Sequence, residues 1–346
     1  MKNFWQQLER PFFVLAPLAN VTDAAFRRLI AKHSKVAGAT PYVTYTEFVS
    51  ADGLVLASEE GKAKLMRDLV YTDAERPIVA QLFSATPENM ERAAALVQEL
   101  GFDGIDINMG CPDRAIEKQG AGAKLITTPE LAQEIIAAAK RGAPNLPVSV
   151  KTRLGYNKDS LDEWLPKLLA AEPAVVTIHA RTRKEMSKVP ARWERVKRAV
   201  EIRDELGSKT LIVGNGDVKD VAHGLQLAKE TGADGVMIGR GIFGSPWLFA
   251  APNSDGEKVL GPSLRGYPQT IFPAAVRLRA AVEHTKLFEE LLGDIKSFAI
   301  MKKHFKAYVE GFPGAKELRM ELMETTNAAQ VKEVIERWLH SAKIHS

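Results

Sequence analysis

The sequence predicts an α/β protein in which a (β/α)8 TIM barrel is followed by a smaller all-helical C-terminal domain. Eight short, apolar and β-branched segments recur up to about residue 240, and helix-period stretches separate them. From about Tyr267 the strand pattern stops and only helical periodicity remains. Because near-continuous apolar strands that alternate with amphipathic helices form parallel sheets, eight such units favour closure into a barrel. An open doubly wound sheet is the alternative.

The predicted strands share a short apolar core bounded by turn residues. They are Phe12–Ala16, Tyr42–Thr46, Ile78–Phe83, Gly104–Asn108, Val148–Lys151, Val175–His179, Leu211–Gly214 and Val236–Gly239. The helix after the third strand is typical of the connections, since Thr86 can cap it, Pro87 stands at its first position and Gly101 follows its end. Similar helices are predicted over Pro129–Lys140 and Lys219–Glu230.

The predicted domains are a catalytic barrel over 1–250, a linker over 251–268 and a helical domain over 269–346. Glycine and proline are frequent in the linker, which suits an exposed connection. The helices predicted beyond it are Phe272–Leu287, Leu291–Glu310, Ala315–Thr325 and Ala328–Ser341. Residues 265–346 hold 13 Lys and Arg against 10 Asp and Glu, and this excess is most of the chain's net charge of +4. That asymmetry permits a polyanionic partner without requiring one.

The single cysteine, Cys111, excludes an intrachain disulfide framework and indicates a reducing compartment, so we expect a cytoplasmic protein. The start of the chain lacks the apolar run of a signal peptide. The longest stretch without Asp, Glu, Lys or Arg is too short to span a membrane, so no membrane association is expected. No protein partner and no metal site are indicated.

Polar residues follow seven of the eight predicted strands, at the ends where barrels of this type carry their working residues. Two of these turns, Asn215-Gly216-Asp217 and Gly239-Arg240-Gly241, come after strands seven and eight. Loops in that position commonly bind a phosphate through backbone N–H groups, and Arg240 would add charge. Each glycine pair alone could be an ordinary turn, but their joint placement favours a phosphate site.

Lys151 stands at the end of an apolar strand, where an unpaired ammonium is expensive to bury. It should face an anion, such as the N1–O2 edge of a reduced flavin. The alternative is a structural ion pair with a carboxylate such as Asp106. His179 also follows an apolar strand, and a lone histidine there is more often a hydrogen-bonded core residue than a ligand.

Cys111 alone would be read as a small buried hydrophobic residue. It follows Asn108 at the end of a strand, however, and lies between Gly110 and Pro112, so its side chain should leave the strand where a substrate would approach. A reactive role is therefore the better interpretation.

The run DINMGCP at 106–112, with the glycine-bearing loop to Gly122, strongly resembles the tRNA-dihydrouridine synthase family. Other segments resemble the remaining signatures of that family in the same order. They are APL at 16–18 with TD at 22–23, AQLF at 80–83, VKTRLG at 150–155, TIHARTR at 177–183, GNGD at 214–217 and MIGRG at 237–241. The resemblance is close over about residues 12–250 and covers the helical tail only in character.

The resemblance implies an FMN-containing barrel, a helical RNA-binding domain, tRNA as substrate and NADPH as reductant. The FMN contacts that it implies are Pro17, Leu18, Ala19, Gln81, Lys151, His179, Asn215, Gly216, Asp217, Gly239 and Arg240. Asn108 and Arg181 would lie near the uracil. The chain departs from the family at Leu18, Asn20 and Ala180, and segment 185–193 departs too, so no contacts are assigned there.

The implied reaction transfers hydride from reduced FMN to C6 of uracil, and Cys111 then protonates C5. An ordinary thiol has a pKa of about 8.5 and can give a proton at neutral pH. The uridine must first be extruded from the RNA stack, while basic residues hold the RNA. Candidates in the tail are Arg277, Arg279, Lys302, Lys303, Lys306 and Arg319, although each one alone could belong to a solvated helix face.

Two alternative functions remain. A flavin barrel acting on a free small molecule, such as a dihydropyrimidine or dihydroorotate dehydrogenase, would share nearly the whole FMN site. The basic helical tail argues against it, because a small substrate would not need that tail. A non-catalytic RNA-binding protein on a barrel scaffold is the second alternative, and the set of Asn108, Cys111 and Lys151 argues against it.

Overall fold

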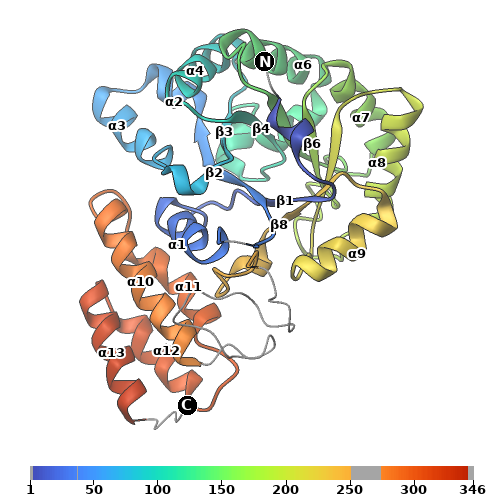
Figure 1. Ribbon diagram of the computed structural model, residues 1–346. Helices are drawn as coiled ribbons and strands as arrows, with labels where there is room; N and C mark the ends of the chain where they lie inside the picture. The colour runs from blue at the N-terminus through green and yellow to red at the C-terminus, as the bar shows by residue number, and fades with distance from the viewer. Residues whose placement is uncertain (1–2, 37, 251–273, 342–346) are drawn as a thin grey trace. The chain divides into compact units, whose positions relative to one another are not determined.

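The structure, a computed structural model, describes residues 3–36, 38–250 and 274–341. It confirms the predicted fold class, because eight parallel strands close into a barrel in sequence order and alternate with helices (Figure 1). The strands are β1 (Phe12–Leu15), β2 (Tyr42–Ser50), β3 (Ile78–Phe83), β4 (Gly104–Met109), β5 (Val148–Arg153), β6 (Val175–His179), β7 (Leu211–Asn215) and β8 (Gly235–Ile238).

The chain divides into two compact units. The first comprises Met1–Leu18, Tyr42–Val70 and Arg76–Arg240, and the second comprises Ala19–Pro41, Tyr71–Glu75 and Gly241–Ser346. The predicted linker, 251–268, lies outside the described residues. The helices of the first unit are α2 (Ala51–Leu56), α3 (Glu59–Asp68), α4 (Pro87–Glu99), α5 (Arg114–Lys118), α6 (Pro129–Gly142), α7 (Leu161–Ala170), α8 (Trp193–Glu205) and α9 (Val221–Thr231).

Local sequence signals explain where these helices begin and end. Pro87 occupies the first turn of α4, as predicted, and Gly101 follows its end with φ +77°. Thr86 stands at the N-cap position, as predicted, but its side chain makes no capping hydrogen bond. The hydroxyl of Ser84 instead accepts from the Thr86 N–H at 2.8 Å and donates to Asp52 at 2.9 Å.

The barrel interior is apolar at one level and polar at the next. The apolar level is a cluster of buried residues that includes Trp5, Val14, Tyr45, Val79 and Met237. Strand register then places polar side chains side by side, since Gln81 pairs with Asp106 and Asp106 pairs with Ser149. Because residues two apart on a strand share a face, Asn108 and Lys151 follow Asp106 and Ser149 toward the carboxyl ends of β4 and β5.

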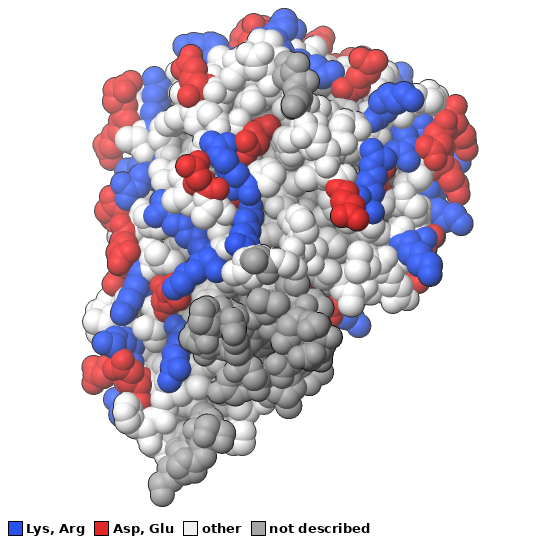
Figure 2. Space-filling view, viewed as in Figure 1, with Lys and Arg blue, Asp and Glu red and all other residues white. Residues whose placement is uncertain are grey.

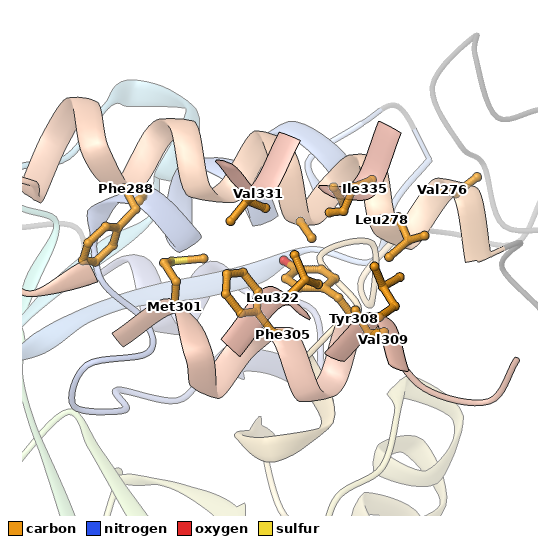
Figure 3. Close-up of a cluster of buried hydrophobic side chains, with 14 of the residues drawn as sticks. Val276, Leu278, Phe288, Met301, Phe305, Tyr308, Val309, Leu322, Val331 and Ile335 are labelled. Atoms are coloured by element: carbon orange, nitrogen blue, oxygen red, sulfur yellow. The ribbon is translucent and has the colours of Figure 1, made fainter. Parts of the chain in front are cut away.

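The second unit is helical and has its own core. Its helices are α1 (Ala24–Ser34), α10 (Ala274–Leu292), α11 (Met301–Tyr308), α12 (Ala315–Glu324) and α13 (Ala328–Ser341). Figure 3 shows Phe288, Met301, Phe305 and Leu322 pointing into one buried apolar cluster between these helices. The helix α1 packs against α10 in this unit.

The helices predicted for 315–325 and 328–341 are confirmed, whereas the single helix predicted over 291–310 is wrong. The preceding helix, α10, runs on to Leu292, and a turn separates it from the helical segment that leads into α11. Ser297 begins the next helical segment, a short 3₁₀ helix over Phe298–Ile300, by accepting the Ala299 N–H. No helix among the described residues is long and apolar enough to cross a membrane.

Candidate active site at the carboxyl ends of the barrel strands

The barrel brings together predicted site residues from five consecutive strands. Register pairs Asn108 of β4 with Lys151 of β5, and His179 of β6 with Asn215 of β7. Gln81 of β3 reaches the same ring, because its side-chain oxygen accepts from the Asn108 amide at 3.0 Å. Residues more than a hundred positions apart in the sequence therefore share one end of the barrel.

Cys111 lies on the loop after β4, and its backbone is held at both ends. Its N–H donates to the side-chain oxygen of Asn108 at 2.9 Å, and its carbonyl accepts from Ala123 at 2.9 Å. Gly122 allows this close approach, because it has φ +63° and a Cβ there would lie 2.8 Å from the Cys111 carbonyl oxygen. The loop thus presents the cysteine in one defined position.

The thiol of Cys111 is kept in its protonated form by its surroundings. The side chain is partly buried and packs against an apolar cluster that includes Phe83 and Ile116. Burial raises the pKa of the thiol above its ordinary value, and this outweighs the nearby charges of Arg153 and Lys151, which lower it. At neutral pH the group is therefore a thiol, which could donate a proton, rather than a thiolate.

Lys151 does not form an ion pair with Asp106, which is the alternative to an anionic ligand. The carboxylate of Asp106 instead accepts from Gln81 at 2.6 Å and from the Ser149 hydroxyl at 2.6 Å. Within the described residues the Lys151 ammonium has no salt bridge. Burial lowers its pKa to about 8, so most of it still carries a proton at neutral pH. A half-buried cation without a salt bridge is suited to an anionic ligand.

His179 is held as a neutral imidazole by its neighbours. Its Nε2 lies 3.0 Å from an Arg181 guanidinium nitrogen, and because arginine can only donate, Nε2 accepts and the ring proton belongs on Nδ1. Burial lowers the pKa of His179 far below its usual range, and the positive charges of Lys151 and Arg153 lower it further. The ring can therefore offer an Nδ1–H donor but no charge.

Arg181, predicted to lie near the uracil, has most of its donors engaged inside the protein. Its Nε donates to the Val189 carbonyl at 2.6 Å, one terminal nitrogen meets His179, and the other pairs with Asp217. Asp217 also pairs with Arg240 at 2.6 Å. A hydrogen-bonded row thus runs from the end of β6 across β7 to the end of β8.

The loop after β7 is shaped by glycine. Gly216 has φ +131°, and a Cβ there would lie 2.7 Å from the Ala191 Cβ, so a side chain has no room. The Gly216 carbonyl accepts from the Trp193 indole at 2.8 Å, and the Asn215 amide donates to the Met237 carbonyl at 2.9 Å. These contacts fix the backbone next to β8.

The loop after β8 contains a more open glycine. A Cβ on Gly239 would meet only the Ala16 and Leu18 side chains, at 3.6 and 3.9 Å, which are ordinary contacts. Leu18 packs against the apolar interior cluster, and Pro17 precedes it after β1. Ala19, the third residue predicted in that segment, is assigned to the second unit.

Arg153 is a site residue that sequence reasoning did not assign. Its guanidinium donates to the carbonyls of Gly110 at 2.7 Å, Thr182 at 3.1 Å and Met186 at 3.0 Å. It therefore ties the Cys111 loop to the loop after β6. Its position at the end of β5 was visible, but its partners are backbone atoms far away in the sequence, which no local motif reveals.

The basic residues predicted to contact RNA lie on the helical unit in two kinds of environment. Arg277 donates to the Glu310 carbonyl at 2.6 Å and Arg319 donates to the Val309 carbonyl at 3.0 Å, so these two support the fold. Lys303 and Lys306 are exposed on α11. On the face drawn in Figure 2, basic and acidic side chains are interspersed, so net charge alone does not mark a binding surface there.

Fold and site together define a class: a (β/α)8-barrel protein with a polar site at the carboxyl ends of its strands, where a cysteine, a lysine without a salt bridge and two glycine-shaped loops meet. Barrels of this architecture place active sites at that end.

The family follows from comparison with known proteins. The family model described as Dihydrouridine synthase (Dus) matches residues 14–343. A probable tRNA-dihydrouridine synthase of Staphylococcus aureus (strain COL) is 39% identical over 340 residues, which are 97% of this chain and 96% of that protein. Probable tRNA-dihydrouridine synthase 2 of Bacillus subtilis (strain 168) is 40% identical over 337 residues, with the same coverage. The chain belongs to the dihydrouridine synthase family, as predicted.

Among solved structures, morphinone reductase resembles the chain with a TM-score of 0.48 and 12% identity, over 76% of this chain and 90% of that one.

Proposed function

We propose that this protein reduces a uridine in tRNA to 5,6-dihydrouridine, with FMN bound at the carboxyl end of the barrel and NADPH as the reductant. The relatives at 39% and 40% identity carry that activity in their names, and they are matched over nearly their whole length. The observation that carries the proposal is the placement of Cys111, a protonated thiol on a fixed loop beside Asn108.

The residues present fit FMN. Lys151 offers a half-buried ammonium without a salt bridge for the anionic edge of the reduced ring. Gly239 leaves space beside the backbone, and with Arg240 it suits a phosphate group. When bound, FMN would supply the hydride that C6 of uracil accepts. The FMN contacts proposed are Pro17, Leu18, Ala19, Gln81, Lys151, His179, Asn215, Gly216, Asp217, Gly239 and Arg240.

The residues of the chain then have separate tasks. Asn108 and Arg181 border the base, and Cys111 transfers its thiol proton to C5, which becomes electron-rich as C6 is reduced. The proton leaves sulfur as a C5–H bond forms, and solvent returns a proton to the thiolate afterwards. Burial keeps the thiol protonated in the resting protein, and the proton moves because the electron-rich C5 is a far stronger base than a thiolate.

The helical unit is proposed to hold the tRNA while the uridine is extruded from its stack, at a cost of about a few kcal/mol. The exposed lysines Lys303 and Lys306 of α11, with Lys302 and Arg279, are the proposed phosphate contacts. Arg277 and Arg319 are less available, since backbone carbonyls occupy them.

The test is conversion of tRNA from cells that lack this gene, using purified protein, FMN and NADPH, with dihydrouridine mapped by position. We expect dihydrouridine at defined positions and no turnover of free uracil, uridine or dihydroorotate. Turnover of a free pyrimidine with no modification of tRNA would favour the small-molecule dehydrogenase instead. A protein that binds tRNA but cannot be loaded with flavin would favour the non-catalytic alternative.

A further inference from the structure

The ring at the end of the barrel contains a row of hydrogen-bonded residues whose buried end, Asp106, has no task in the proposed function. It runs from Asp106 through Gln81 and Asn108 to the backbone N–H groups of Gly110 and Cys111. The distances along it are 2.6 Å from Gln81 Nε2 to Asp106 Oδ2, 3.0 Å from Asn108 Nδ2 to Gln81 Oε1, and 3.1 and 2.9 Å from the two N–H groups to Asn108 Oδ1.

The donor and acceptor roles are fixed at both ends of this row. The backbone N–H groups of Gly110 and Cys111 can only donate, so Asn108 must turn its oxygen toward them and its amide nitrogen toward Gln81. Gln81 must then accept with its oxygen and donate with its nitrogen, and the partner of that nitrogen must be an acceptor. An ionised carboxylate meets this requirement in every orientation, because both of its oxygens only accept.

Asp106 is placed to fill that role, and the Tyr45 hydroxyl also donates to it. It is fully buried at the level of the polar side chains below the site, and its second oxygen accepts from the Ser149 hydroxyl at 2.6 Å. It makes no ion pair with Lys151, the half-buried cation two residues beyond Ser149 on the neighbouring strand. Burial raises the pKa of the Asp106 carboxyl to about 6, while its hydrogen bonds and the charge of Lys151 lower it, so the group is mostly ionised at neutral pH.

We propose that Asp106 is a positioning residue, which orients the Gln81 and Asn108 amides and through them fixes the loop that presents the Cys111 thiol. The chemical consequence rests on the proposed function, in which Asn108 borders the base and Cys111 supplies the proton. The mechanical consequence does not, because the position of the loop can be measured without RNA or reductant.

The single cysteine of the chain provides that measurement. Alkylation of Cys111 by iodoacetamide, followed over a pH profile in the flavin-loaded protein without RNA, separates access to the thiol from its pKa. In Asp106→Leu the Gln81 nitrogen loses its acceptor, both amides can turn, and the Cys111 N–H loses a fixed partner. The high-pH alkylation rate should rise about three- to tenfold, which is the effect of losing about one hydrogen bond from a local equilibrium.

Two matched variants locate the effect in the row. Ser149→Ala removes one donor to Asp106 that lies outside the row and leaves the row intact, so its alkylation rate should stay within about twofold of wild type. Asp106→Asn should restore wild-type behaviour, because its amide oxygen can accept from Gln81 while its nitrogen donates to Ser149. If Asp106→Leu does not fold, Gln81→Met breaks the row at its middle and should show the same rise.

The same variants are then assayed with tRNA. Asp106→Leu should slow reoxidation of the reduced protein by tRNA while reduction by NADPH stays near normal, and Asp106→Asn should recover both. An alkylation rate in Asp106→Leu equal to that of wild type would overturn the positioning role. Where Asp106→Leu does not fold, the same result in Gln81→Met would overturn it. An equal rise of the rate in Ser149→Ala would overturn it too. If alkylation follows the prediction but no variant, wild type included, acts on tRNA, the positioning role stands and the proposed function fails.

Discussion

Arg240 and Asp217 form an ion pair across the ends of β8 and β7, with a guanidinium nitrogen 2.6 Å from Oδ1 of the carboxylate. The arginine side chain is 64% exposed and the aspartate side chain is 38% exposed. The other oxygen of Asp217 accepts from the Ala191 N–H at 2.9 Å and pairs with Arg181. These two contacts hold the carboxylate in place independently of Arg240. Asp217 therefore holds Arg240 beside the two glycine-shaped loops.

Arg240→Ala should release most of the flavin and leave the fold intact. Exposed ion pairs contribute about 0–1 kcal/mol to stability, so the melting temperature should change little. The ratio of flavin to protein after gel filtration measures retention. Arg198→Ala is the control, because Arg198 also forms exposed ion pairs but lies on α8. An Arg240→Ala protein that keeps its flavin as wild type does would remove Arg240 from the proposed phosphate site.

Gly239→Ala should separate ligand binding from folding. The new methyl group would meet only ordinary contacts at 3.6 and 3.9 Å, so thermal stability should stay near wild type while flavin retention falls. Gly235→Ala should behave in the opposite way, because its Cβ would lie 2.6 Å from the Phe12 ring in the barrel wall and the melting temperature should drop. Equal flavin retention in Gly239→Ala and wild type would contradict a phosphate cradle at this loop.

The second unit should be acid-sensitive because of His284 and His304. Their rings lie 4.4 Å apart in the buried core, and within the described residues neither nitrogen of His304 has a hydrogen-bond partner. Burial lowers the pKa of His304 to about 3 and lowers the pKa of His284 as well. As the pH falls, these two histidines therefore bind protons in the unfolded chain before they do so in the folded unit.

This linkage has a defined sign and window. A histidine with a lowered folded pKa contributes stability above the unfolded pKa of about 6.5, and that stability is lost as the pH falls toward the folded value of about 3. The free energy of unfolding of the second unit, measured by urea titration, should fall steadily from pH 7 to pH 4. His304→Phe should flatten this slope, while His340→Phe, at an exposed position of α13, should not. An equal slope in His304→Phe and wild type would show that the buried pair is not its cause.

The strand pattern could be predicted from the sequence because each strand is short, apolar and followed by turn residues. The end of β2 could not, since Thr46 and Glu47 interrupt the apolar run. The strand nevertheless continues to Ser50, because the β2 to β3 register shifts between Tyr45 and Phe48 and the Thr46 hydroxyl accepts the Gln81 N–H at 3.0 Å. A polar residue can thus lie within a strand when the neighbouring strand supplies its hydrogen-bond partner.

The sequence predicts only part of the candidate site, for a similar reason. The positions of Lys151, His179 and Cys111 at or near the carboxyl ends of strands follow from the repeat, whereas the roles of Arg153 and Asp106 depend on partners supplied by other strands and loops. The sequence suggests Asp106 only as an ion-pair partner for Lys151. Its neighbours Gln81 and Ser149 become apparent only when the register of β3, β4 and β5 is known.

The domain boundaries also depend on long-range packing. The second unit includes α1, which packs against α10 although some 240 residues separate them in the chain. Phe26 of α1 stacks on His284 at 4.7 Å between ring centres. A chain cut near Gly266 would therefore uncover the buried face of α1. We expect such a fragment to lose activity on tRNA and also to melt at a lower temperature than the full chain, which thermal unfolding of the two proteins would check.

The most direct test of the proposed chemistry separates the two half-reactions in Cys111→Ala. NADPH should reduce the flavin-loaded variant at nearly the wild-type rate, because that step needs no proton at uracil C5. Reoxidation by substrate tRNA should slow by about 10²–10⁴-fold, the usual contribution of a positioned acid, and Cys111→Ser should recover little because an alcohol is a far weaker acid than a thiol. Rapid-mixing absorbance of the flavin measures both rates. Reoxidation of the alanine variant at the wild-type rate would show that Cys111 is not the proton donor.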